Sequence, residues 1–159
     1  MNSIYPLCTK SIRLAIGLMS GTCTDGIDAA LVRIENFSTE TKVKLIKFTT
    51  IPYEASLRTL LLDISKGNTY GSEEISKLNF LLGQLLADAC LRVCELADIN
   101  PTEIDFIGSH GHTIFHQPDS IPYFNHTVTS TLQIGEASVI NEVMKCPVVS
   151  DFRVRDMAA

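Results

Sequence analysis

Residues 17–28 read Gly-Leu-Met-Ser-Gly-Thr-Cys-Thr-Asp-Gly-Ile-Asp, and this stretch decides how the chain begins to fold. It follows an apolar run from Ile12 to Ile16 and precedes a second one from Ala29 to Ile34. Two apolar runs separated by a glycine-punctuated, polar segment are typical of two strands joined at a hairpin tip. The stretch therefore predicts the tip of the first β-hairpin.

The hairpin tip carries groups that bind anions and divalent cations. Gly21 and Gly26 have no side chain, so backbone N–H groups there can come close to an anion. Hydroxyl donors and carboxylates accompany them: Ser20, Thr22 and Thr24, with Asp25 and Asp28. Either carboxylate can reach a magnesium ion, directly or through water. The same residue types build ordinary turns, so the tip alone leaves a phosphate site and a plain turn both open.

Composition narrows the class of protein. The 159 residues are 45% hydrophobic and 19% charged, which is typical of one globular α/β domain. The net charge of −5, with no basic block, disfavours a nucleic-acid partner. No apolar stretch is as long as a bilayer span and no signal peptide is evident, so we expect a cytoplasmic protein without a membrane partner. Of the five cysteines, Cys90 and Cys94 lie one helical turn apart; burial in a helix is favoured over a metal pair.

Periodicity predicts the order of elements along the chain. Residues 1–11 are interpreted as a leader and 118–130 as a loop. Three strands in an antiparallel meander are expected at 12–19, 28–35 and 42–53, because short polar connectors join them. Helices are expected at 54–66, 72–97 and 136–145, and short strands at 104–108, 131–134 and 147–150.

This order defines a fold class. Three antiparallel strands followed by helix, strand, helix and strand predict an α/β, ribonuclease-H-like (actin-like ATPase) domain, with parallel strands added beside the first hairpin strand and helices flanking the sheet. We expect one such domain over residues 12–159. In this fold the tip of the first hairpin faces the nucleotide.

Four segments in register then identify a family. They are Gly17-Leu-Met-Ser-Gly-Thr-x-x-Asp-Gly-Ile-Asp28, Gly108-Ser-His-Gly-x-Thr113, Thr131-Leu-Gln-Ile-Gly135 and Val149-Ser-Asp-Phe-Arg-x-x-Asp-Met-Ala158. Each is a weak signal alone, but together the chain resembles the anhydro-N-acetylmuramic acid kinases. The resemblance implies ATP and Mg²⁺ as cosubstrates, hydrolytic opening of a 1,6-anhydro sugar with phosphorylation of O6, and a role in peptidoglycan recycling.

The resemblance also implies site residues. The family's ATP-binding stretch falls on Gly21, Thr22, Cys23, Thr24, Asp25, Gly26, Ile27 and Asp28, with Asp25 the candidate for magnesium through water. Candidates for sugar binding are Ser109, His110, Gly111, His112, Thr113, Asp151 and Arg153. The alternatives are a capped strand-to-loop turn or a metal pair at the two histidines, and a surface ion pair among Asp151, Arg155 and Asp156.

This chain departs from the family pattern in three ways. Cys23-Thr24 replaces a serine and a bulky apolar residue, and His112 replaces a glutamine. The family's water-activating aspartate lies in an Asp-Thr-Gly-Pro-Gly motif, which is absent from these 159 residues. We therefore expect an N-terminal half with no catalytic base of its own and no turnover alone. Its partner is a complementing C-terminal half or, as in a homodimer, a second copy. Other actin-like sugar or acetate kinases, and a non-catalytic nucleotide-binding or docking fragment, are the alternatives.

Overall fold

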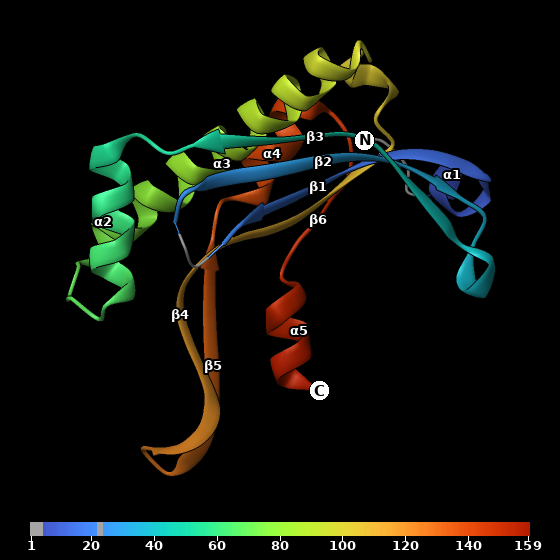
Figure 1. Ribbon diagram of the computed structural model, residues 1–159. Helices are drawn as coiled ribbons and strands as arrows, with labels where there is room; N and C mark the ends of the chain where they lie inside the picture. The colour runs from blue at the N-terminus through green and yellow to red at the C-terminus, as the bar shows by residue number, and fades with distance from the viewer. Residues whose placement is uncertain (1–4, 22–23) are drawn as a thin grey trace.

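The computed structural model describes residues 5–21 and 24–159. One mixed sheet holds six strands, and helices lie on both of its faces (Figure 1). The strands are β1 (Ile12–Ser20), β2 (Gly26–Glu35), β3 (Lys42–Pro52), β4 (Phe106–Tyr123), β5 (His126–Ile134) and β6 (Val148–Val149). The helices are α1 (Tyr5–Thr9), α2 (Ala55–Ser65), α3 (Ser72–Ala97), α4 (Ala137–Met144) and α5 (Phe152–Ala158), with 3₁₀ turns η1 (Ser38–Glu40) and η2 (Pro101–Glu103). Among these described residues no helix is long and apolar enough to cross a membrane.

The sheet topology matches the predicted order. β2 pairs antiparallel with both β1 and β3, whereas β4 runs parallel to β1 and β6 runs parallel to β4. The predicted three-strand meander, extended by two parallel strands, is therefore confirmed. Helices α2, α3 and α4 also begin and end within one residue of their predicted limits. The segment interpreted as a leader contains the short helix α1.

One prediction about the second half of the chain is wrong. Residues 118–130, expected to be a loop, form the outer part of a long β4–β5 hairpin that turns near Phe124. β4 changes partners at His112, pairing parallel with β1 up to this residue and antiparallel with β5 from it onward. Most side chains of the outer hairpin are exposed, so no alternation of buried and exposed residues marks these strands in the sequence. A register shift between Gln117 and Ile121 accommodates Pro118, as proline in sheets requires.

The hydrophobic core lies between α3 and one face of the sheet. Leu82, Leu86 and Val93 of α3 are almost fully buried. Leu86 and Val93 pack in one cluster with residues of β1 and β2 such as Ile16 and Leu31, and Leu82 packs in a second cluster with Ile134 of β5. The i, i+4 spacing of Leu82 and Leu86 puts both on one side of the helix, so α3 buries a continuous stripe. α4 lies on the same side of the sheet as α3 (Figure 1).

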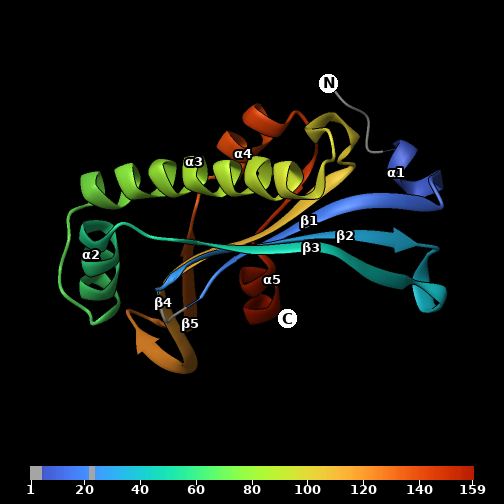
Figure 2. The same ribbon diagram turned by 45° about the horizontal axis from the view of Figure 1, so that its top comes forward.

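The opposite face of the sheet is open over much of its area. A row of register partners crosses it from β3 to β6, with small residues at its centre: Phe48, Ala30, Gly17, Gly108 and Val149. Phe48 and Val149 are about half exposed. α5 lies on this face, below the sheet in Figure 2, where the Phe152 ring approaches Gly108. Apolar side chains on this face therefore remain in contact with solvent.

Candidate functional site

A backbone hydrogen bond joins the two sides of the loop between β1 and β2. Thr24 is buried, has a φ of 55°, and donates its N–H to the carbonyl of Gly21 at 3.0 Å. A Cβ on Gly26 would lie 2.2 Å from the carbonyl oxygen of Ile51, whereas one on Gly21 would meet nothing within 4 Å. Gly26 therefore allows β3 to approach, and Gly21 leaves its backbone open to a ligand. Thr22 and Cys23, two of the predicted ATP-binding residues, lie outside the described residues.

The two carboxylates of the tip have different surroundings. Asp25 is exposed and forms an ion pair with Arg58 of α2 at 3.0 Å. Asp28 is part of β2 and accepts a hydrogen bond from the Thr50 hydroxyl at 2.6 Å. Ile27, between them, points its side chain into the core, so only its backbone is available to a ligand. Within the described part of the chain no three acidic, histidine or cysteine side chains are grouped to hold a metal ion.

Behind the loop lies a buried chain of hydrogen bonds. The Tyr53 hydroxyl donates to Ser20 Oγ at 2.8 Å, and Ser20 Oγ is 2.8 Å from His112 Nδ1. The tyrosine ring also meets the imidazole edge-on, with ring centroids 6.3 Å apart. Burial lowers the pKa of His112 to about 4, with a smaller contribution from His110, so the imidazole is neutral near pH 7. Burial also raises the pKa of Tyr53, although its bond to Ser20 opposes this.

A polar cavity of about 190 Å³ gathers residues from three of the four sequence motifs. Its lining comes from the bend of β4, the end of β5 and the segment before α5, together with one residue of α3: Ser109, His110, Gly111, Gln133, Ile134, Gly135, Glu136, Ala137, Ser150, Asp151 and Asn79. Ser109 Oγ is buried and has no hydrogen-bond partner among the described residues. Carboxylates, an imidazole, hydroxyls and amides around a small cavity are suited to binding a hydroxyl-rich ligand.

Asn79 is a residue of this site that sequence reasoning missed. Its Oδ1 accepts from the N–H of Gly135 at 2.8 Å, and its Nδ2 donates to Glu136 Oε2 at 3.0 Å. Hydrogen bonds from Ser138, more than that from Asn79, hold the pKa of Glu136 below its usual value. In the sequence, Asn79 is marked only by its amide side chain, which adjoins the apolar stripe of α3.

The structure places the predicted sugar-binding residues in two groups. Ser109, His110, Gly111 and Asp151 line the polar cavity. The others do not line it: His112 is engaged with Ser20, Thr113 accepts a hydrogen bond from Gln133 Nε2 at 3.2 Å, and Arg153 lies half-buried in α5. Contact between these three residues and a sugar stays a prediction.

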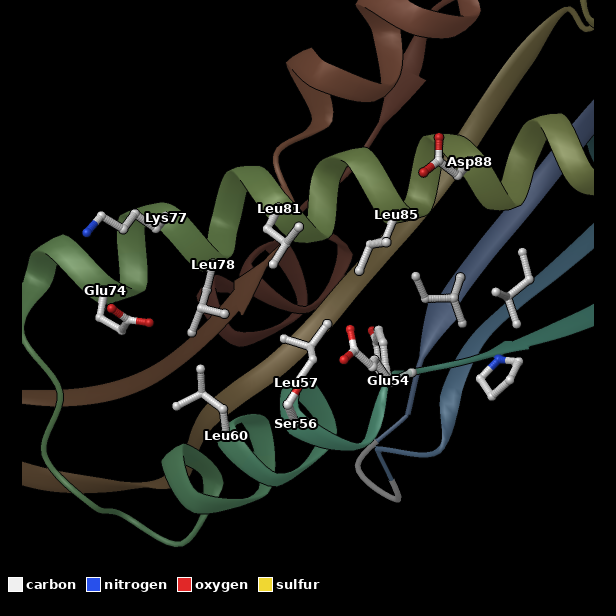
Figure 3. Close-up of a pocket in the computed structure, with 14 residues that line it drawn as sticks. Glu54, Ser56, Leu57, Leu60, Glu74, Lys77, Leu78, Leu81, Leu85 and Asp88 are labelled. Carbon is white, nitrogen blue, oxygen red and sulfur yellow. The ribbon is translucent and has the colours of Figure 1, made fainter.

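A larger groove of about 590 Å³ lies between α2, α3 and the end of β3. Leucines of the two helices face one another across it, among them Leu57, Leu78 and Leu81, while Glu74 stands at its rim (Figure 3). Tyr53 forms part of its wall, so this residue separates the apolar groove from the hydrogen-bonded chain behind the loop. The groove contains none of the residues predicted to bind the sugar.

The cysteines behave as the sequence predicts. Cys90 and Cys94 of α3 are fully buried in the hydrophobic core, where Cys146 also lies. Burial raises the pKa of all three thiols, that of Cys146 to about 11, so they remain protonated. Burial of Cys90 and Cys94 as small core residues is therefore confirmed.

With the fold and the site described, comparison with known sequences gives the class of protein. The sequence pattern of a kinase family matches residues 13–159, which is nearly the whole chain. The chain belongs to the anhydro-N-acetylmuramic acid kinase family.

Two relatives illustrate the match. The chain is 45% identical over 159 residues to the anhydro-N-acetylmuramic acid kinase of Caldanaerobacter subterraneus, covering all of this chain and 40% of that protein. It is 46% identical over 143 residues to that of Bacillus cereus strain Q1, covering 90% of this chain and 37% of that one. The chain thus spans about two fifths of the length of these relatives. A solved CasPhi-2 complex aligns with a TM-score of 0.24 and 11% identity, which is too low to indicate a shared fold.

Proposed function

We propose that this chain forms the part of an anhydro-N-acetylmuramic acid kinase that binds ATP phosphates and one side of the sugar. The reaction proposed is ring opening of 1,6-anhydro-N-acetylmuramic acid by water with phosphorylation of O6, in peptidoglycan recycling. One observation carries this proposal: motifs that are far apart in the sequence meet at one end of the sheet. Ser20 of the first motif pairs with His112 of the second, which adjoins the cavity lined by Gly135 and Asp151 of the other two.

The hairpin tip is the proposed site of MgATP. Gly21 leaves room for a phosphate to approach the backbone, and Arg58 brings a guanidinium to the loop through its ion pair with Asp25. Magnesium bound to nucleotide phosphates usually keeps several waters and needs only one or two carboxylates. Asp25 and Asp28 suit that role through water. Positioning and charge neutralisation are most of what phosphoryl transfer requires from a protein.

The polar cavity is the proposed site of the sugar. Ser109 Oγ is a buried hydroxyl without a partner among the described residues, so a ligand hydroxyl there would satisfy it. His110 and Asp151 line the same cavity. The histidine ring offers a donor and an acceptor, and the carboxylate offers acceptors only. These residues bind and orient; none of them is assigned the activation of water, which the family resemblance gives to the Asp-Thr-Gly-Pro-Gly motif.

The proposal extends to fold class, domain and location. The sheet order β3-β2-β1-β4, with β2 antiparallel to its neighbours and β6 parallel to β4, supports a ribonuclease-H-like, actin-like ATPase domain over residues 12–159. We assign the chain to the N-terminal part of the kinase because its four motifs resemble those of that part of the family, and the chain spans about two fifths of its relatives' length. The use of ATP makes the cytoplasm the proposed location, and the partners are a complementing C-terminal part and a second copy of the enzyme.

A chimeric enzyme tests the function. This chain would replace the matching two fifths of the Caldanaerobacter kinase, and product would be followed by mass spectrometry with the anhydro sugar and ATP. We expect a sugar 6-phosphate and ADP from the chimera and no turnover from the 159-residue chain alone. A folded chimera without product would reject the proposed reaction. Turnover by the chain alone would show that its catalytic base is present here.

A docking role is the second candidate, and the open sheet face favours it. Phe48, Val149 and Phe152 expose apolar surface together on this face, and such clusters often mark an interaction surface. The two candidates differ in MgATP binding. Saturable binding of MgATP by the chain, weakened in Arg58→Ala, supports the kinase role, whereas its absence favours docking alone.

A further inference from the structure

The hydrogen-bonded chain of Tyr53, Ser20 and His112 joins three separate parts of the fold. Ser20 is the last residue of β1, His112 belongs to β4, and Tyr53 directly follows β3. Both bonds measure 2.8 Å, and the serine and histidine are 2% and 1% exposed. Polar groups buried to this degree are stable only in an arrangement that pairs them, so a network of this kind selects one geometry.

Tyr53 holds both ends of the loop that joins β1 to β2. Its hydroxyl bonds to Ser20, immediately before Gly21, and its backbone N–H donates to the carbonyl of Asp25 at 3.2 Å. The loop is therefore held next to its first residue by the side chain of Tyr53 and at its last residue by the amide of Tyr53. Through Ser20 the loop is also bonded to His112, three residues from Ser109 in the polar cavity.

The direction of the bond between Ser20 and His112 depends on the histidine tautomer. Tyr53 donates to Ser20 Oγ, which keeps one proton and one lone pair for His112 Nδ1. When the serine donates, Nδ1 accepts and the neutral ring carries its proton on Nε2. Nε2 is buried and has no hydrogen-bond partner among the described residues.

We propose that Tyr53, Ser20 and His112 are positioning residues that hold Gly21 and Asp25, the ends of the loop, in register with the cavity segment Ser109–Thr113. The inference rests on the proposed function, in which the loop binds ATP phosphates and the segment binds the sugar. None of the three contacts a reacting atom. Their role is to keep the two bound groups at a fixed separation, on which the rate of phosphoryl transfer depends.

Two measurements on the 159-residue chain test this inference without any ligand. In ¹⁵N NMR spectra at neutral pH, we expect His112 to carry its proton on Nε2. In hydrogen exchange, His112→Phe and Ser20→Ala should speed exchange at the loop amides by about five- to tenfold, the effect of one lost buried hydrogen bond. His112→Gln should restore slow exchange, because an amide keeps one donor and one acceptor. His116→Phe is the matched control, since His116 is an exposed residue of the same strand.

The outcomes separate this inference from the proposed function. Loop exchange unchanged in folded His112→Phe and Ser20→Ala would overturn the inference. If either variant fails to fold, Tyr53→Phe removes a single oxygen atom and carries the exchange test, with Tyr123→Phe at the exposed hairpin as control. Isothermal titration with MgATP then tests the proposed function. Absence of binding to the wild-type chain counts against the nucleotide site and does not change the NMR result. We expect His112→Phe to weaken MgATP binding about five- to tenfold and His112→Gln to recover it.

Discussion

Replacing Gly26 with alanine should destabilise the chain much more than the same change at Gly21. A Cβ on Gly26 would lie 2.2 Å from the carbonyl oxygen of Ile51 and 2.9 Å from two further backbone atoms of β3. Ordinary contact requires the strands to separate by about 1 Å at this point. No flexible side chain can move to relieve the overlap, because every atom in contact is backbone.

The size of the effect follows from two opposing contributions. Forcing an extra carbon into a packed site costs about 1–3 kcal/mol, and a strand pair is a rigid neighbour that favours the upper end. Alanine also reduces the entropy of the unfolded chain, which favours folding by about 0.4–1 kcal/mol. We therefore expect Gly26→Ala to lower the free energy of unfolding by about 2 kcal/mol. At Gly21 only the second contribution applies, since nothing lies within 4 Å.

Urea unfolding followed by circular dichroism measures both variants. Gly26→Ala should lower the midpoint concentration without a change in m, and Gly21→Ala should leave the midpoint unchanged or raise it slightly. Equal midpoints for the two variants would refute the claim that close approach of β3 requires glycine at position 26. A midpoint lowered only in Gly21→Ala would reverse the assignment of the two glycines.

Three further predictions concern the site and the core. Asn79→Ala should reduce the free energy of unfolding by about 1–3 kcal/mol in urea, since it removes the acceptor for Gly135 N–H; an unchanged midpoint would contradict this. The pKa of His112 is about 4 in the folded chain, below its ordinary value of 6.5, so between these two pH values the unfolded chain binds more protons than the folded chain. The contribution of neutral His112 to the free energy of unfolding is therefore present above pH 6.5 and declines towards pH 4. Denaturation curves at pH 4.5 and 7 should show a smaller loss in His112→Gln than in the wild type, and equal losses would count against the lowered pKa. Iodoacetamide at pH 8, followed by peptide mapping, should label the exposed Cys8 in the folded chain and leave Cys90 protected until urea is added; equally rapid labelling of both would show that the core is not closed.

The parts of the fold that the sequence predicted are those with a local signature. α3 runs from Ser72 to Ala97 as expected, because its buried residues recur at helical spacing from Leu78 to Cys94. The hairpin of β1 and β2 was predicted from two apolar runs around a glycine-rich tip. The outer β4–β5 hairpin was not, because its residues are exposed and its pairing depends on contacts between 112–123 and 126–134.

The candidate site was predicted in part for the same reason. Ser109, His110 and Asp151 could be named from motifs, and the structure brings them to one cavity. Tyr53 could not, since a single tyrosine after a strand has no local pattern, and Asn79 was marked only by an amide beside the apolar stripe of α3. Their partners, Ser20 and Gly135, lie 33 and 56 residues away in the chain.

The sequence by itself determined the antiparallel meander, the long amphipathic helix and the family to which the chain belongs. These follow from periodicity and from short motifs, which depend on neighbouring residues alone. Only the tertiary structure decided that Gly26 serves the approach of β3, that His112 bonds to Ser20 beneath the loop, and that Asn79 lines the polar cavity. Those roles arise from distances between residues far apart in the chain, and such distances exist only after the sheet and α3 have packed together.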